Sequence, residues 1–318
     1  MGALPETPVR LLLVGLLLTT AACRRAAPER PPSDALERRT SPADYSGLAW
    51  VGADTFLVVH DAKVPEELDR PRVGLAVLPP AGGPVVWHAL DVAWPASHGP
   101  AHDLESVARI PGTRSFLLAE SGDGATPHQH LFVAELGRTT LRITAVARWP
   151  VPVEDVEGIA TAEVGGALYF LYAERAHGRD TTQLAWAPMR RTPLSFGAFT
   201  SVPFMSPDPR GPSARPVSAL EVDRLGRLYV GSAYDPDRDS GPFRSVVWEV
   251  GTFGLTRQGR PSLTLDDEPV RRGTLDGLKV ESVAVREGAT GPMELLVGTD
   301  DEDYGAVLRV LPPPLPPR

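Results

Sequence analysis

A short phrase that recurs five times along the chain constrains its fold more than any other feature of the sequence. The phrase is an apolar stretch with Ser or Glu near its start. Its second position falls at Ser46, Glu105, Glu157, Ser218 and Glu281. The copies lie about 60 residues apart, and a fixed interval of this kind indicates repeated supersecondary units. We therefore expect each copy to begin one unit that packs against the next.

The same succession of turns and apolar segments follows each phrase. A turn with Gly, Pro or Asp leads to a second apolar segment, and a third follows. Fourth segments are visible in the first three units (VVWHALDV, LRITAVARW and FGAFTSVPF) and weakly in the fourth (SLTLDD). The segments are short and rich in β-branched and aromatic residues, and none of comparable length has a helical period. Four strands a unit, repeated radially, predict an all-β chain folded as a β-propeller with five four-stranded blades.

The end of the repeat bears on the number of blades. The fifth unit has only three strands before the chain becomes proline-rich. A propeller ring has to close, and residues 35–41 (ALERRTS) can supply the missing strand from the N-terminal side. A six-bladed propeller, with a degenerate blade hidden in the long intervals, is the alternative. We expect the propeller domain to span residues 35–311, with a proline-rich tail over 312–318.

The N-terminal segment has the order of features found in exported lipoproteins. Arg10 precedes the apolar run Leu11–Leu18, which is far too short to span a bilayer as a helix. The small residues TTAA then lead to Cys23, with Thr20 where Leu is usual in a lipoprotein box. We predict a signal peptide over residues 1–22 and lipidation of Cys23. An ordinary cleaved signal that leaves a free cysteine is the alternative.

The residues after the signal predict how the domain is held and where. Residues 23–34 are charged and proline-rich, so they predict a flexible tether. Arg24 stands where an inner-membrane retention signal has Asp, so we expect the cell envelope, at the outer membrane or the cell surface. Cys23 is the single cysteine, which excludes an internal disulfide framework and cysteine-based metal clusters.

The charge balance limits the partners. The net charge of −8 argues against a nucleic-acid binder, which would carry a basic surface. The expected partners are the membrane, through the lipid on Cys23, and an unidentified small molecule or envelope protein. We expect the protein itself to be a monomer.

Propeller topology predicts where the acidic residues gather. The first strand of each blade lines the central channel, so Glu105, Glu157 and Glu281 lie at the beginning of channel strands. The second strand returns to the same face, and the loop after it opens on the same side. The expected ligand-binding residues at this mouth are His60, Asp61, His102, Asp103, Glu120, Asp155, Glu174, Asp235 and Asp301.

Three carboxylates that converge on one axis repel one another, so protons, a cation or a basic side chain must neutralise them. Glu105, Glu157 and Glu281 are therefore the candidate metal ligands. Calcium is the favoured ion because the donors are hard oxygens. The alternatives are glutamates that accept backbone hydrogen bonds and staple the blades, or a carboxylate pair in acid–base catalysis.

The repeated phrases also resemble those of a known family. SGLAW followed by FLVVHD, DLESVA followed by FLLAESGDG, and DVEGIA followed by LYFLYAER are similar to segments of the SdiA-regulated and phytase-like (esterase-like) bacterial β-propeller proteins. The resemblance covers about residues 44–310. It implies an exported propeller, often lipid-anchored, with calcium in or near the channel. The candidate phosphate-binding bases, Lys63, Arg175, Arg179 and Arg244, are outnumbered by acids.

Two functions are compatible with these features. The first is a ligand- or partner-binding propeller at a membrane, with an acidic, cation-binding channel mouth. The second is a calcium-dependent phosphoesterase or esterase, in which carboxylates hold a metal that activates water. A lactonase-like or sugar-oxidising propeller is a third, on architecture alone. The sequence contains no GxSxG, P-loop, HExxH or dinucleotide motif, so no catalytic residue is assigned.

Overall fold

The computed structural model describes residues 44–61, 71–79, 83–122, 129–176, 178–288 and 293–313. The predicted signal peptide, Cys23, the tether and the candidate closing strand at 35–41 lie outside these residues. Within the described part the chain is all-β and forms five separate sheets. No helix in that part is long and apolar enough to cross a membrane.

Each sheet is one blade, numbered here I to V in chain order. Blade I holds β1 (Gly47–Gly52), β2 (Thr55–Val59), β3 (Val73–Val77) and β4 (Val86–Ala89). Blade II holds β6 (Leu104–Arg109), β7 (Ser115–Glu120), β8 (His130–Leu136) and β9 (Thr140–Arg148), with β5 (Asp91–Ala93) added at its outer edge. Blade III holds β10 (Val156–Val164), β11 (Ala167–Glu174), β12 (Thr181–Arg191) and β14 (Thr200–Met205), and β13 (Leu194–Phe196) pairs with the end of β12.

The last two blades differ in size. Blade IV holds β15 (Ala214–Val222), β16 (Arg227–Tyr234), β17 (Arg244–Leu255) and the long β18 (Pro261–Asp276). Blade V holds three strands, β19 (Val280–Arg286), β20 (Glu294–Thr299) and β21 (Leu308–Val310). A short 3-10 helix, η2 (Glu302–Tyr304), lies between β20 and β21.

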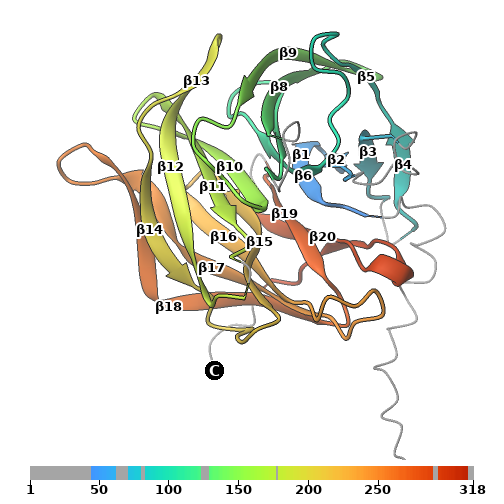
Figure 1. Cartoon of the computed structure of the whole chain (residues 1–318), viewed down its shortest axis with the longest axis vertical. Coiled ribbons are helices and arrows are strands. Elements are labelled where there is room, and N and C mark those ends of the chain that lie inside the picture. Colours follow the sequence, from blue (N-terminus) through green and yellow to red (C-terminus); the bar gives the residue numbers. More distant parts are fainter. Residues whose placement is uncertain are drawn as a thin grey trace, which may run out of the picture.

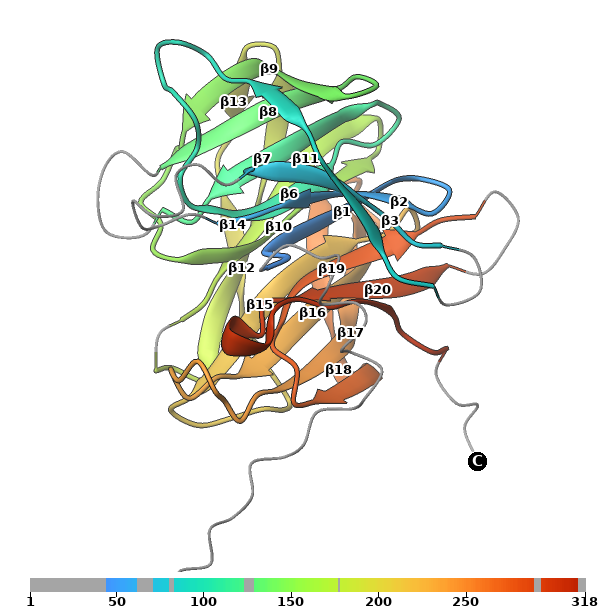
Figure 2. The same ribbon diagram turned by 90° about the vertical axis from the view of Figure 1, so that its right-hand side faces the viewer.

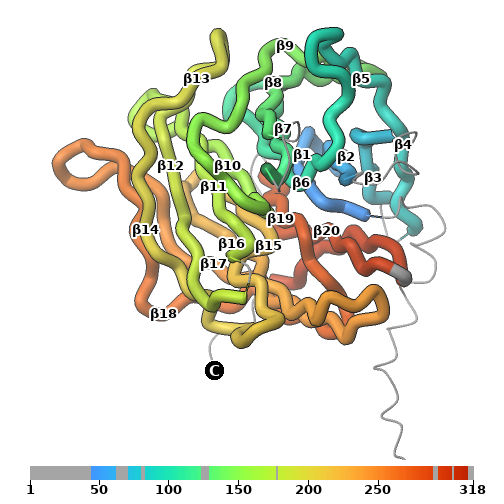
Figure 3. Tube along the Cα trace, viewed as in Figure 1, coloured from blue at the N-terminus to red at the C-terminus, as the bar shows by residue number. Residues whose placement is uncertain are grey.

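The five sheets are arranged in a ring, with β1, β6, β10, β15 and β19 toward its middle (Figure 1). Each of these inner strands contacts the inner strand of the next blade, and β19 contacts β1. The colours of Figure 3 follow the chain round the ring in sequence order. The five-bladed propeller is therefore confirmed, and the six-bladed alternative is wrong.

One outer strand departs from the sequence-based expectation. The segment VVWHALDV is predicted as a single strand, but it divides into two. β4 pairs antiparallel with β3, whereas β5 leaves blade I and pairs in parallel with β9 of blade II. Leu90, between them, packs in the apolar core shared by these two blades, together with Leu104 and Phe132. Burial of Leu90 in this core accounts for the crossing.

The ring closes between the first and the last blade, which lie side by side in Figure 2 (blue and red). The Tyr45 N–H donates to the Thr299 carbonyl (3.1 Å), and Ser282 Oγ donates to the Tyr45 carbonyl (2.7 Å). The Tyr45 side chain is fully buried against Ala284 and Leu296 of blade V. These contacts join the inner strands of blades I and V, and the outer strand expected from residues 35–41 lies outside the described residues.

The recurring glutamates coincide with irregularities in strand pairing. In β6, Leu104 pairs with Glu120 and Ser106 with Ala119, so Glu105 is the extra residue of a β-bulge. The same shift occurs at Glu157 in β10 and at Glu281 in β19. A bulge bends its strand and changes the direction in which a side chain points. The bulge thus gives the repeated glutamate its distinct orientation within an otherwise regular inner strand.

The residue after each bulge is small because neighbouring inner strands approach closely there. A Cβ atom on Gly158 would lie 2.7 Å from the backbone nitrogen of Leu220 in blade IV, a contact that real Cβ atoms essentially never make. At the equivalent position of blade II, Ser106 Oγ accepts a hydrogen bond from the Ile159 N–H of blade III (3.0 Å). The repeated Glu-small pair therefore joins adjacent blades at the channel.

Candidate functional site at the glutamate mouth

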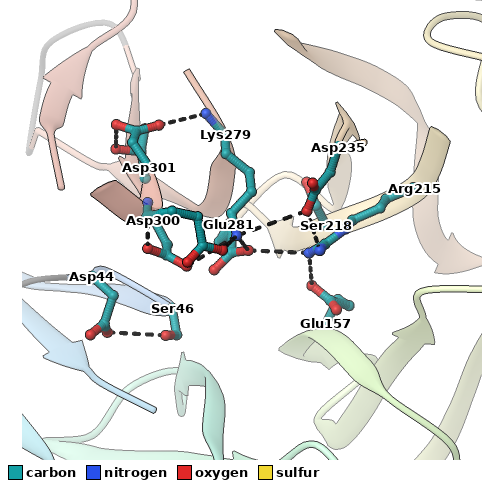
Figure 4. A network of polar contacts seen from close by, with 12 residues as sticks. Asp44, Ser46, Glu157, Arg215, Ser218, Asp235, Lys279, Glu281, Asp300 and Asp301 are labelled. Carbon is teal, nitrogen blue, oxygen red and sulfur yellow. Dashed lines mark hydrogen bonds and ion pairs between the residues drawn. The ribbon is translucent and has the colours of Figure 1, made fainter. Parts of the chain in front are cut away.

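The beginnings of the inner strands form one end of the channel, which we call the glutamate mouth. It contains Glu105, Glu157 and Glu281 together with Ser46 and Ser218, and all five residues are buried. Figure 4 shows most of this region. In blade I, Ser46 Oγ donates to the carboxylate of Asp44 (3.1 Å), so that blade also places an acid beside its serine.

A buried arginine links three blades at this mouth. Arg215 lies on β15, and only 8% of it is exposed. Its Nη1 is 3.2 Å from Glu281 Oε1 and 3.8 Å from Glu157 Oε2, and its Nη2 pairs with Asp235 (Figure 4). Burial alone would lower the pKa of Arg215. The carboxylates of Glu157 and Glu281 outweigh this effect, so the pKa lies above its ordinary value. Arg215 is therefore a fixed positive charge among the glutamates.

A lysine neutralises the same cluster from blade V. The Lys279 Nζ lies 3.1 Å from Glu281 Oε1 and 3.0 Å from Asp300 Oδ2, and it also pairs with Glu302. Burial opposes the charge on Lys279, but the carboxylates of Glu281 and Asp300 raise its pKa above the ordinary value. Lys279 thus remains charged although it is buried.

Arg175, after β11, is a further base of the mouth. Its Nη1 lies 3.1 Å from Asp155 Oδ2 and 3.6 Å from Glu157 Oε1. The surroundings of Glu157 remain unfavourable to its charge all the same. Burial raises the pKa of Glu157 well above its usual range, and Arg215 only partly opposes the effect. Basic side chains and a tendency to take up a proton therefore both reduce the repulsion at this mouth.

The three glutamates do not form a single tight group. Glu105 and Glu281 are near enough to raise the pKa of Glu157. The carboxylate oxygens that lie within 4.8 Å of one another belong instead to Asp61, Asp103 and Glu105, which we call the carboxylate triad. An isolated β-bridge between Asp61 and Asp103 joins the segment after β2 of blade I to the beginning of blade II. The triad unites one expected metal ligand with two expected ligand-binding residues.

The chemistry of the triad suits calcium. Calcium is bound by hard oxygens at about 2.3–2.6 Å, so oxygens on opposite sides of the ion are about 5 Å apart. The 4.8 Å span of the triad is within that limit. Three protein oxygens leave several of the six to eight coordination positions for water or for ligand oxygens. Asp61, Asp103 and Glu105 are therefore the residues that would hold a calcium ion.

Several other expected ligand-binding residues hold the loops of the mouth in place. Glu120 accepts hydrogen bonds from the backbone N–H groups of His102 (3.2 Å) and His130 (2.9 Å). Asp301 accepts from the Lys279 N–H and from Thr299 Oγ1, both at 2.6 Å.

Glu174 and His60 have comparable local partners. Glu174 Oε1 accepts a hydrogen bond from the Glu154 N–H (2.9 Å). His60 is buried, and its Nδ1 lies 2.9 Å from the Asp44 carbonyl oxygen. Asp155 and Asp235, in contrast, belong to the ion pairs of Arg175 and Arg215.

Sequence reasoning missed Arg215 and Lys279, two buried bases of the mouth. Of the bases it named, Arg175 is in the network, Arg179 is exposed, and Arg244 pairs with Asp208 and Asp276. Lys63 lies outside the described residues. A signal was present, because Lys279 directly precedes the last phrase and Arg215 shortly precedes Ser218, where the phrase lacks a glutamate.

Comparison with known proteins gives distant structural likenesses. No family model matches the chain, and no curated protein sequence matches it. Among solved structures, the GH43 endo-arabinanase from Bacillus licheniformis is 9% identical, with a TM-score of 0.43 over 85% of this chain and 94% of that one. An exo-1,5-α-L-arabinanase from a bovine ruminal metagenomic library is 8% identical, with a TM-score of 0.43 over 85% and 93% of the two chains. The β-propeller fold is shown by the five sheets themselves, and the SdiA-regulated or phytase-like resemblance stays a prediction.

Proposed function

We propose that this chain is an exported, lipid-anchored β-propeller that binds calcium at the carboxylate triad and holds a small molecule or an envelope partner there. The convergence of Asp61, Asp103 and Glu105 carries the proposal. These residues come from two blades, and oxygens from all three lie close enough to contact one ion. A bound calcium would offer its remaining positions to oxygens of the ligand.

Binding is better supported than catalysis by the state of the other two glutamates. Glu157 and Glu281 contact Arg215, and Glu281 also contacts Lys279. Carboxylates held in buried ion pairs are constrained in position and less available as nucleophiles or bases than free ones. Their role in this proposal is to fix the wall of the mouth beside the triad.

Calcium binding can be tested by thermal unfolding of the exported protein with calcium and with chelator. A ligand that binds only the folded state stabilises it by about 2.7 kcal/mol at a concentration a hundred times its Kd. We expect millimolar calcium to raise the Tm of the wild type. Glu105→Gln and Asp61→Asn should abolish the rise, whereas Glu135→Gln, an exposed carboxylate of blade II, should keep it. A wild-type Tm that calcium leaves unchanged would refute the calcium site.

The anchor requires a separate test. The tether over residues 23–34 would keep the propeller within about 20 Å of the membrane, from the usual reach of a flexible chain. Expression with a labelled fatty acid should label the wild type and not Cys23→Ser. Equal labelling of both proteins would show that Cys23 is not the attachment site.

Hydrolysis is the competing function, and the triad allows it to be tested directly. We expect no turnover of aryl phosphates, phytate or aryl esters with calcium present. Calcium-dependent turnover that disappears in Glu105→Gln and persists in Glu135→Gln would replace the binding function with a phosphoesterase or esterase at the same residues.

A further inference from the structure

A cavity of about 930 Å³ opens at the other end of the channel, which we call the far mouth. It is lined by the final residues of the inner strands and the turns after them. Every blade contributes, with Trp50, Arg109, Thr161, Glu221 and Val285 as one representative from each. A cavity of this size can hold a small organic molecule. The glutamate mouth lies at the opposite ends of the same strands.

The charged groups around this cavity are mostly acidic, and most have partners. Asp223 pairs with Arg227 (2.6 Å), and Glu287 accepts a hydrogen bond from the Arg224 N–H (2.8 Å). Glu163 is exposed at the rim.

Glu221 differs from the other acidic side chains that line the cavity because it is partly buried and has no partner of opposite charge among the described residues. Within the described part of the chain, its carboxylate accepts a hydrogen bond from the N–H of its own neighbour, Val222 (2.9 Å). No ion pair with a described residue accompanies it. Burial raises the pKa of Glu221 to about 8, and the carboxylates of Glu287 and Asp223 add to the effect. A positive charge placed beside Glu221 would therefore relieve both desolvation and repulsion.

The remaining lining indicates what kind of cation fits. The lining includes Val51 and Val164, whose side chains are partly exposed, beside the largely buried Val222, Val285 and Phe253. Such walls suit an alkyl group better than the hydration shell of a metal ion. The Arg109 guanidinium lies 5.3 Å from the centre of the Trp50 ring, so this aromatic face is occupied by a cation of the protein itself.

We propose that the far mouth binds a small organic cation, an alkyl guanidinium or ammonium, with its charge against Glu221 and its alkyl part along the apolar wall. The site is separate from the carboxylate triad and does not depend on calcium. Glu163, Asp223 and Glu287 add negative potential around the ligand, while Arg109 and Arg224 oppose it. Anionic ligands are disfavoured because four carboxylates line the cavity against these two arginines.

The probes for a test are butylguanidinium and butylurea, which are similar in shape and differ in charge. Guanidinium stays protonated throughout the accessible pH range, so any pH dependence of its binding arises from the protein. By isothermal titration with the full chain, we expect butylguanidinium to bind at least ten times more tightly at pH 9 than at pH 6, since Glu221 ionises between them. Butylurea should bind weakly at both pH values, and calcium should change neither result.

Two matched variants distinguish the contribution of Glu221 to binding from the general effect of negative charge around the cavity. Glu221→Gln should weaken butylguanidinium binding at pH 9 by at least tenfold and remove its pH dependence. Glu163→Gln removes the same charge from the rim and should weaken binding less than threefold. Equal binding of the two probes, or equal losses in the two variants, would overturn the proposal. A wild-type affinity that is the same at pH 6 and pH 9 would also overturn it.

Discussion

The two mouths of the channel are made by the same five strands, yet their charges are organised differently. At the glutamate mouth, Arg215 and Lys279 contact carboxylates from several blades within a buried network. At the far mouth, Glu221 faces a cavity and has no described ion-pair partner. The contrast shows that acidic residues at a channel do not by themselves identify a binding site. What distinguishes Glu157 and Glu281 from Glu221 is whether a basic side chain of the protein lies beside the carboxylate.

The largest expected change in stability comes from a substitution that breaks the ion-pair network of the glutamate mouth. Arg215→Met leaves the carboxylates of Glu157, Glu281 and Asp235 without their shared cation. Removal of one partner from a buried ion pair typically destabilises a protein by about 3–5 kcal/mol. Urea unfolding should show a loss of this size, and Arg142→Met is the control. Arg142 pairs with Glu135 at the surface, where the loss should be below about 1 kcal/mol. Equal losses would mean that the network does not hold the blades together.

At the far mouth, in contrast, we expect a substitution to stabilise the protein. The pKa of Glu221 rises from 4.5 to about 8 on folding, so the folded state binds the proton more tightly and loses stability as pH increases through this range. Glu221→Gln removes that loss. At pH 9 the variant should be more stable than the wild type by about 2 kcal/mol, roughly half of what the full pKa shift allows. At pH 4 urea unfolding should show little difference, and a variant that is less stable at both pH values would contradict this account.

The smallest expected change in stability concerns the contact between blades V and I that closes the ring. Ser282→Ala removes the hydrogen bond from Ser282 Oγ to the Tyr45 carbonyl (2.7 Å) between blades V and I. Loss of one such bond should lower the free energy of unfolding by about 1 kcal/mol. Thr144→Ala, which removes a bond from Thr144 Oγ1 to the Val133 carbonyl (3.2 Å) within blade II, is the control. If Ser282→Ala has no effect while Thr144→Ala does, closure does not depend on this bond.

The sequence predicted the architecture because the repeat is visible in it. The five phrases located the inner strands, and the glutamates within them lie at one mouth of the channel as expected. The crossing of β5 to blade II was not predictable, since it depends on packing of Leu90 between two sheets. Arg215 was missed, although it shortly precedes the phrase that lacks a glutamate, because that position alone does not show that its side chain reaches blades III and V.

The cavity at the far mouth could not be predicted from the sequence either, for a different physical reason. Trp50, Arg109, Thr161, Glu221 and Val285 are unlike one another, so the ends of the inner strands carry no repeated residue. A cavity depends on the distance between walls and on the side chains that leave space there. The burial that raises the pKa of Glu221 comes from three-dimensional packing around the end of β15, which no pattern in one strand reports.

The contact that closes the ring can form only after blade V has been synthesised. Tyr45 is synthesised before Ser282, which lies 237 positions later in the chain. Blade I therefore presents its unpaired side until the C-terminal blade is available. Contacts of such long range slow folding, because the chain between them has to be ordered first. A chain that stops before β19 would lack the blade V partners of Tyr45, so blade V decides whether the earlier blades become a closed ring.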